Sequence, residues 1–76
     1  MPTKKSAPNL AIGTAIRTLR KAQGATQEAF ALKAGLDRSY YGAIERGEFN
    51  ITVDTLVTVA DGLGVSPSEV LRLAGL

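Results

Sequence analysis

One local pattern occurs four times in this chain of 76 residues and constrains the fold more than any other feature. Each time, a residue of the kind that caps helix N-termini follows an apolar residue directly and precedes a second apolar residue by four positions. Such an apolar pair packs across the first helical turn as a hydrophobic staple, while the cap's side-chain oxygen accepts a backbone N–H of that turn. The pattern predicts that helices begin directly after Thr26, Asp37, Thr52 and Ser66.

Helical spacing of apolar residues extends this prediction to nearly the whole chain. No stretch alternates convincingly between apolar and polar residues, as a strand would. With a first helix that begins near Pro8 and Asn9, we expect an all-α fold with helices at about 9–23, 27–34, 38–46, 53–62 and 67–74. Residues 1–8 are polar and contain proline, and are expected to form a flexible tail ahead of one domain over residues 9–76.

The composition argues against several classes of function. The chain has no cysteine and no histidine, so it lacks thiolate chemistry, the commonest metal ligand and the commonest general base. We therefore expect neither an enzyme nor a metal site, and no cofactor. The apolar runs are far shorter than the roughly 20 residues that span a bilayer. The first residues also lack the apolar stretch of a signal peptide, so we expect a cytoplasmic protein with no membrane partner.

Charge is distributed unevenly along the chain. Residues 1–38 carry seven basic side chains against two acidic ones, whereas residues 39–76 carry two basic side chains against five acidic ones. A basic half is compatible with an ordinary solvated surface and also with binding to a polyanion such as nucleic acid. Charge alone leaves both interpretations open.

The second and third expected helices are joined by only a few residues around Gly35, which predicts a helix-turn-helix over about 27–46. On the third helix, a rotation of about 100° per residue places Tyr41 and Ile44 on one face, which we expect to pack inward. The opposite face is expected to be small, polar and basic, and to comprise Ser39, Gly42, Ala43 and Arg46.

A helix with such a face fits the major groove of B-DNA, which is about 12 Å wide and is read by side chains near the helix N-terminus. Arg38 suits a bidentate contact with guanine, and Ser39 suits a base or a phosphate. Tyr40 suits a thymine methyl, although it could equally lean on the first helix. Gly42 would serve a close approach to DNA or to a neighbouring helix. The residues expected to read bases are Arg38, Ser39, Tyr40 and Ala43.

The sequence resembles the lambda-repressor-like, or Cro/C1-type, helix-turn-helix proteins of the XRE family. The resemblance extends from Leu10 to Val70, and its elements are Ile16, Leu19, Arg20, Thr26, Gln27, Ala31, Gly35, Leu36 and the run Ile44-Glu45-Arg46-Gly47. It implies a five-helix lambda-repressor-like DNA-binding domain. It further implies that Gln27 binds a phosphate with help from the helix dipole. Arg20 and Glu45 would form a structural ion pair, buried or half-buried, between the first and third helices.

Within that family, the stretch DRSYYGAIERGEFNIT is most similar to the controller proteins of restriction-modification systems. That similarity implies that Arg38, Ser39 and Tyr40 read bases while Asn50 and Thr52 hold phosphates. Thr52 also has the role of a helix cap. The residues expected at DNA phosphates are Gln27, Lys33, Arg46, Asn50 and Thr52.

The C-terminal helix has more apolar residues than one face of a small core requires. Val70 and Leu73 are expected in the core, whereas Leu71, Ala74 and Leu76 are expected at a two-fold dimer interface. The alternative is a helix that packs entirely within one chain. A dimer would hold two recognition helices about 34 Å apart, one turn of B-DNA, and so bind a palindromic operator.

The expected function is that of a homodimeric, sequence-specific transcription regulator that binds double-stranded DNA. As a restriction-modification controller protein, it would regulate its own promoter, with RNA polymerase as a further partner. Two alternatives stay open at this point: the antitoxin of a toxin–antitoxin pair, whose partner is a protein, and a phage or mobile-element repressor.

Overall fold

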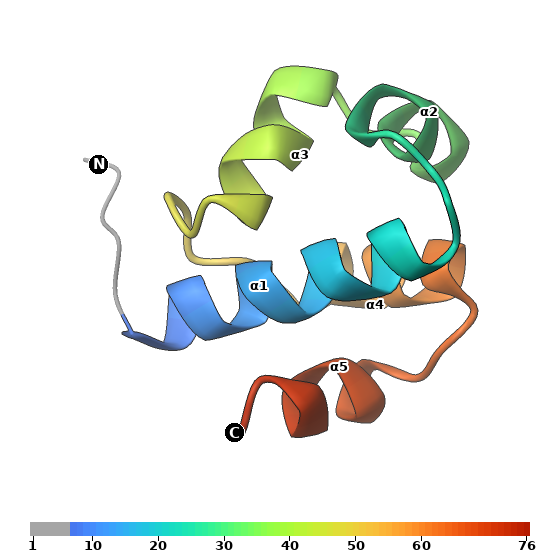
Figure 1. The fold of residues 1–76 in the computed structure, drawn as a ribbon. Coiled ribbons are helices and arrows are strands. Elements are labelled where there is room, and N and C mark those ends of the chain that lie inside the picture. Colours follow the sequence, from blue (N-terminus) through green and yellow to red (C-terminus); the bar gives the residue numbers. More distant parts are fainter. Residues whose placement is uncertain (1–6) are drawn as a thin grey trace.

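The computed structural model describes residues 7–76, and this part of the chain forms five α-helices and no strand (Figure 1). The helices are α1 (Ala7–Ala22), α2 (Gln27–Ala34), α3 (Arg38–Glu45), α4 (Val53–Leu63) and α5 (Pro67–Leu73). The all-α prediction is confirmed, and the predicted helix ends lie within about two residues of the observed ones. Residues 1–6 of the predicted flexible tail lie outside the described residues, whereas Ala7 and Pro8 belong to α1.

The predicted helix starts owe their positions to side-chain caps. Thr26, Asp37, Thr52 and Ser66 are the N-caps of α2 to α5, and each accepts a hydrogen bond from the backbone N–H three residues further on. The apolar residues on either side of each cap lie in the core or pack against it. Because each cap satisfies a backbone donor that the helix cannot, these short helices begin at defined residues.

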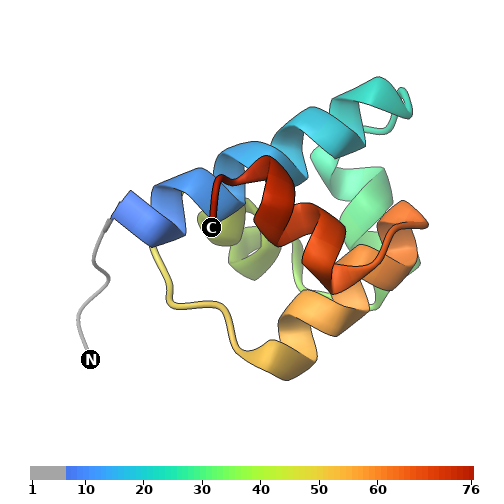
Figure 2. The ribbon, with the colours of Figure 1, turned by 90° about the horizontal axis from the view of Figure 1, so that it is seen from below.

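Helix α1 lies in the middle of the molecule and contacts α3, α4 and α5 (Figure 1). Helix α3 lies on one side of α1, and α5 crosses α1 on the other side, as Figure 2 shows from below. The largest fully buried side chains are Tyr41, Phe30, Ile16, Val59 and Val70. The rings of Phe30 and Tyr41 are 5.0 Å apart between centroids and join α2 to α3. None of the helices between residues 7 and 76 is long and apolar enough to span a membrane.

Helix α3 ends directly on α1 because Gly13 has no side chain. A Cβ atom at Gly13 would lie 2.5 Å from the carbonyl oxygen of Glu45 and 2.6 Å from that of Ile44, far inside van der Waals contact. Gly47, with φ at 75°, then turns the chain away, and a Cβ there would lie 2.9 Å from the Cα of Leu10. The C-terminal end of α3 is thus fixed on α1, and its N-terminal end is the end farther from α1 (Figure 1).

Burial along α5 differs from the prediction. Val70 is fully buried as expected, but Leu73, which was expected in the core, is 46% exposed. Leu71, which was expected at the surface, is half-buried against the core, as is Ala74. The buried stripe of α5 therefore follows positions 70, 71 and 74, and Leu73 falls outside it on the helical wheel. Leu76 is 61% exposed, in agreement with its predicted outward position.

Candidate nucleic-acid interface

The N-terminal end of α3 presents two polar side chains to solvent. Arg38 and Ser39 are the first two residues of α3, directly after the N-cap Asp37, and both are exposed. The Arg38 side chain makes no hydrogen bond or ion pair with any other residue between 7 and 76. Its guanidinium group, with five N–H donors, is therefore available to an acceptor on another molecule.

Tyr40, the next residue, is half-buried rather than free. Its ring lies 5.7 Å from the ring of Phe49, centroid to centroid, with the two planes tilted by 53°. Phe49 belongs to the loop between α3 and α4 and was not among the predicted site residues. The sequence signal for it was an aromatic residue in a polar loop, placed nine positions after Tyr40.

Two residues predicted on the outward face of α3 are buried. Ala43, which was expected to read bases, is only 4% exposed, so its predicted outward position is wrong. Gly42 is buried too, and a Cβ there would lie 3.1 Å from Arg46 Nη1 and 3.4 Å from Gln27 Oε1. Helix α3 contacts both α1 and α2, and the following loop returns alongside it, so its buried arc is wider than its apolar stripe. The small residues make room for these neighbours.

A buried polar cluster joins α1, α2 and α3 beneath this surface. The predicted ion pair is present: Arg20 Nε lies 2.6 Å from Glu45 Oε2, and Arg20 Nη2 donates to Glu45 Oε1 at 3.0 Å. The Arg20 and Glu45 side chains are 7% and 2% exposed. Glu45 also accepts hydrogen bonds from Gln27 Nε2 at 2.8 Å and from the Tyr41 hydroxyl, and Arg20 Nη1 donates to the carbonyl of Ala25 at 2.7 Å.

The ionisation of this cluster follows from its contacts. Burial alone would raise the pKa of Glu45, but hydrogen bonds from Arg20, Tyr41 and Gln27 outweigh it and hold that pKa below its ordinary value of 4.5. The hydrogen bond to Glu45 raises the pKa of Arg20, and burial raises the pKa of the Tyr41 hydroxyl. Glu45 is therefore a carboxylate that stabilises the fold, and its acceptor oxygens are occupied by protein donors.

Gln27 connects this cluster to the surface. It is the first residue of α2, directly after the cap Thr26, and it is half-buried. Its amide nitrogen donates one hydrogen bond to Glu45, which leaves its second hydrogen for another acceptor. Since Gln27 and Arg46 both lie over Gly42, the structure brings these two predicted phosphate contacts together.

Apart from Gln27, the predicted phosphate contacts differ in what they bind within the chain. Arg46 is exposed and makes two hydrogen bonds to Glu48, at 2.8 and 3.2 Å. Asn50 is exposed, and its side-chain oxygen accepts a hydrogen bond of 2.8 Å from the buried Asn9 of α1. Thr52 is exposed and caps α4, as predicted, and Lys33 is exposed in the last turn of α2. Asn9 was not among the predicted residues.

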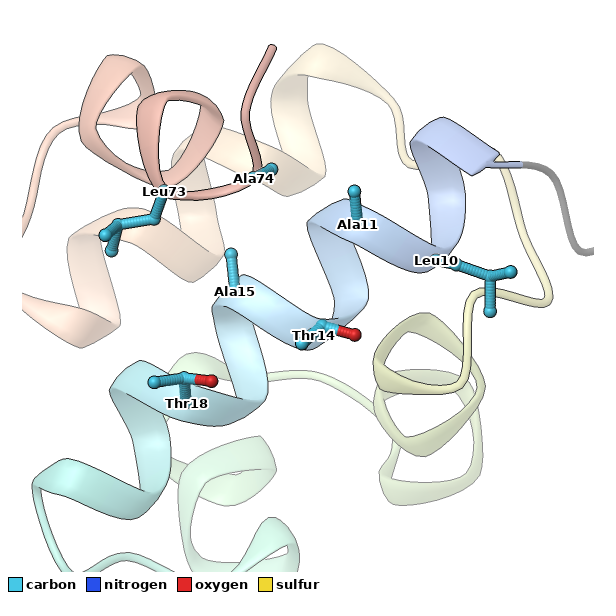
Figure 3. A pocket seen from close by; sticks show the side chains of 7 residues that line it. All are labelled: Leu10, Ala11, Thr14, Ala15, Thr18, Leu73 and Ala74. Atoms are coloured by element: carbon cyan, nitrogen blue, oxygen red, sulfur yellow. The ribbon is translucent and has the colours of Figure 1, made fainter.

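An apolar groove of about 460 Å³ lies between α1 and α5 (Figure 3). It is lined by Leu10, Ala11, Thr14, Ala15, Thr18, Leu73 and Ala74. None of these side chains titrates near neutral pH, and residues 7–76 contain no cluster of acidic side chains that could hold a metal ion. The groove therefore offers apolar contact and two hydroxyl groups, without the groups of a catalytic site.

Two short helices joined by a tight turn, with an exposed polar end on the second, define a helix-turn-helix protein. The chain belongs to the helix-turn-helix family, whose model matches residues 16–70.

Three relatives illustrate what the chain resembles within that family. The chain is 40% identical over 58 residues to the control protein C.MunI of Mycoplasma sp, covering 75% of this chain and 78% of that protein. It is 38% identical to the restriction-modification controller protein C.AhdI from Aeromonas hydrophila, with a TM-score of 0.82 over 86% of this chain and 98% of that one. It is also similar to the controller protein C.Esp1396I, solved as a tetramer with its natural 35 base-pair operator, with 33% identity and a TM-score of 0.82 over 91% of each chain.

Proposed function

We propose that this protein is a sequence-specific, DNA-binding transcription regulator of the restriction-modification controller type. It acts as a homodimer on a palindromic operator and regulates the promoter of its own gene, where RNA polymerase is the further partner. The observation that carries the proposal is the guanidinium of Arg38, which has no hydrogen-bond or ion-pair partner among residues 7–76 and lies beside Ser39 at the exposed end of the second helix of the helix-turn-helix. Relatives that are named as controllers, one of them solved with its operator, support it.

The N-terminal end of α3 enters the major groove in this proposal. Arg38 donates two parallel hydrogen bonds to a guanine edge, a contact that discriminates against other bases by about 1–3 kcal/mol. Ser39 contacts a base or a phosphate, and Tyr40 packs on a thymine methyl. The ion pair between Arg20 and Glu45 fixes α3 on α1, so the reading side chains approach the bases in one orientation.

Phosphate contacts around α3 set the depth and register of the helix in the groove. Gln27 donates its second amide hydrogen to a phosphate at the positive end of α2. Arg46 exchanges Glu48 for a phosphate, and because an exposed ion pair of this kind is weak, the exchange costs little. Lys33, Asn50 and Thr52 complete the set.

The dimer interface is proposed at the end of α5, next to the apolar groove. Leu76 and Leu73 are exposed there, and Leu73 lines the groove together with Leu10 of α1, which is itself exposed. Leu71 contributes less than its sequence position indicated, because it is already half-buried against its own core. Contacting a second copy at this surface would remove three leucine side chains per chain from water.

The test is a selection of bound sequences from random DNA duplexes, followed by affinity measurements over a series of salt concentrations. The wild type should select a palindrome, and Arg38→Ala should lose the base preference at one symmetric pair of positions. Arg72→Ala is the matched control, because it removes an exposed arginine from α5, across α1 from α3 (Figure 1). Gln27→Ala should weaken binding to all sequences similarly.

Two results would count against the proposal in different ways. A wild-type protein that selects no sequence would refute sequence-specific regulation. A consensus that is unchanged in Arg38→Ala would refute the assignment of Arg38 as the reading residue while leaving DNA binding intact.

A further inference from the structure

The loop between α3 and α4 is held at both of its ends. At its start, Gly47 N–H donates to the carbonyl of Ile44 and Glu48 N–H donates to that of Ala43, both at 3.0 Å, which is the hydrogen-bond pattern of a Schellman motif. At its end, Asn50 accepts a hydrogen bond from Asn9, and Thr52 caps α4. Because both ends are fixed, the intervening residue, Phe49, has a defined position beside α3.

The ring of Phe49 packs on Tyr40 and not on the main core. It is 37% exposed and does not belong to the core cluster of the described residues or to the partly buried residues packed against it. Its ring contacts that of Tyr40 in a tilted arrangement, 5.7 Å between centroids, a geometry that aromatic pairs favour. Tyr40 is also held through its backbone, because its N–H donates to the Asp37 carboxylate at 3.0 Å.

We propose that Phe49 is a positioning residue for base reading. It holds the ring of Tyr40 in one orientation at the N-terminal end of α3, and it thereby narrows the base preference at the operator position that Tyr40 contacts. This inference rests on the proposed function, in which Tyr40 lies against a base. Phe49 itself need not touch DNA for this effect.

The physical reason is preorganisation of a side chain that otherwise rotates. Tyr40 is half-buried against the core, and without Phe49 the exposed part of its ring is free to rotate and fits several base edges. Restricting the ring of Tyr40 before binding lowers the entropic cost of contacting the base that fits this orientation. Contacting any other base still requires the ring to reorient. From the usual strength of an aromatic pair, we expect loss of Phe49 to reduce discrimination at that position by about 3- to 10-fold.

The experiment compares Phe49→Ala and Phe49→Leu with the wild type in the same selection from random duplexes. The affinity for the selected operator and its single-base variants is then measured. Leu32→Ala is the matched control, since Leu32 is an exposed apolar side chain of α2, 83% exposed. A double-mutant cycle with Tyr40→Ala isolates the coupling between the two rings. Thermal unfolding and the salt dependence of binding are recorded for every variant.

Support would be a broadened preference at one symmetric pair of positions in both Phe49 variants, with an unchanged salt dependence and no such change in Leu32→Ala. The effect of Phe49→Ala should also vanish when Tyr40 is already alanine. Equal discrimination with and without Phe49 would overturn the inference, and so would a loss that persists in the Tyr40→Ala background. A wild type that selects no consensus would overturn the proposed function and this inference together, whereas an intact consensus in the Phe49 variants would overturn this inference alone.

Discussion

Replacement of Glu45 by alanine should destabilise the domain more than any comparable change at the surface. In the folded chain this carboxylate is 2% exposed and accepts hydrogen bonds from Arg20, Gln27 and Tyr41. Alanine would leave the Arg20 guanidinium buried without its carboxylate, and it would remove the oxygen to which the Tyr41 hydroxyl donates. A buried ion pair that is broken from one side typically costs about 3–5 kcal/mol.

That magnitude is large beside the whole stability of a small domain. At about 0.05–0.15 kcal/mol per residue, a chain of this length has a free energy of unfolding of roughly 4–11 kcal/mol. Glu45→Ala should therefore remove about a quarter of the stability or more. Glu45→Gln should cost less, since its side-chain oxygen can still accept one of these hydrogen bonds, although it leaves the Arg20 charge uncompensated.

Urea unfolding followed by circular dichroism measures this effect. Glu69→Ala is the control, because it also removes a glutamate from an ion pair with arginine, but the Arg72 side chain there is 68% exposed, so the expected loss of stability is small. Equal losses for Glu45→Ala and Glu69→Ala would refute the structural role of the cluster. A stable Glu45→Ala protein with an altered operator preference would refute it as well.

The pH dependence of stability gives an independent check on Glu45. The pKa of Glu45 is lower in the folded chain than its ordinary value of 4.5, so folding favours the ionised form. The resulting stability is fully present above that ordinary value and is lost as the pH falls below it. Wild-type protein should therefore lose more free energy of unfolding on acidification than Glu45→Gln, which has no proton to bind at this position.

Three further predictions follow from the described contacts. Burial raises the pKa of Tyr41, so folding favours its neutral form, and this stability is lost only as the pH rises above the ordinary value of 10.0. In Tyr40→Phe, where Tyr41 is the one tyrosine left, phenolate absorbance should therefore appear together with unfolding. Ionisation of Tyr41 in the folded state near its ordinary pKa of 10.0 would contradict this. Gly13→Ala should lower the free energy of unfolding by at least about 2 kcal/mol, because its Cβ would meet backbone oxygens. Gly42→Ala, whose Cβ would meet only the ends of side chains, should be neutral or stabilising by up to about 1 kcal/mol. Equal losses for the two variants in urea unfolding would be inconsistent with this packing. Leu76→Glu should lower the dimer fraction in sedimentation velocity, and unchanged association would move the interface to another surface.

Local sequence signals predicted the helices well because their causes are local. A cap and the backbone N–H that it binds are three residues apart, and the two apolar residues of a staple are five positions apart, so both can be recognised without knowing the tertiary structure. The ion pair between Arg20 and Glu45 required more, since these residues are 25 positions apart. It was predicted only through the resemblance to a family in which both positions are occupied in this way.

Features that depend on several neighbouring elements were missed or misassigned. The outward position predicted for Ala43 was wrong because helical geometry gives the direction of a side chain but not what later covers it. For the same reason, Leu73, predicted in the core, is exposed, and Leu71, predicted at the surface, packs against the core. The contact between Tyr40 and Phe49 depends on the direction in which a loop leaves α3, and the sequence showed the glycine that sets this turn without showing where the ring would lie.

Tyr41, Ile44 and Glu45 of α3 are buried and fix the helix to the protein, whereas Arg38 and Ser39 at its start are exposed. Substitutions at the two exposed positions should thus be nearly free of folding consequences. A gene duplicate could acquire a different DNA target through one or two codon changes there, and laboratory recoding of the target should begin at the same codons.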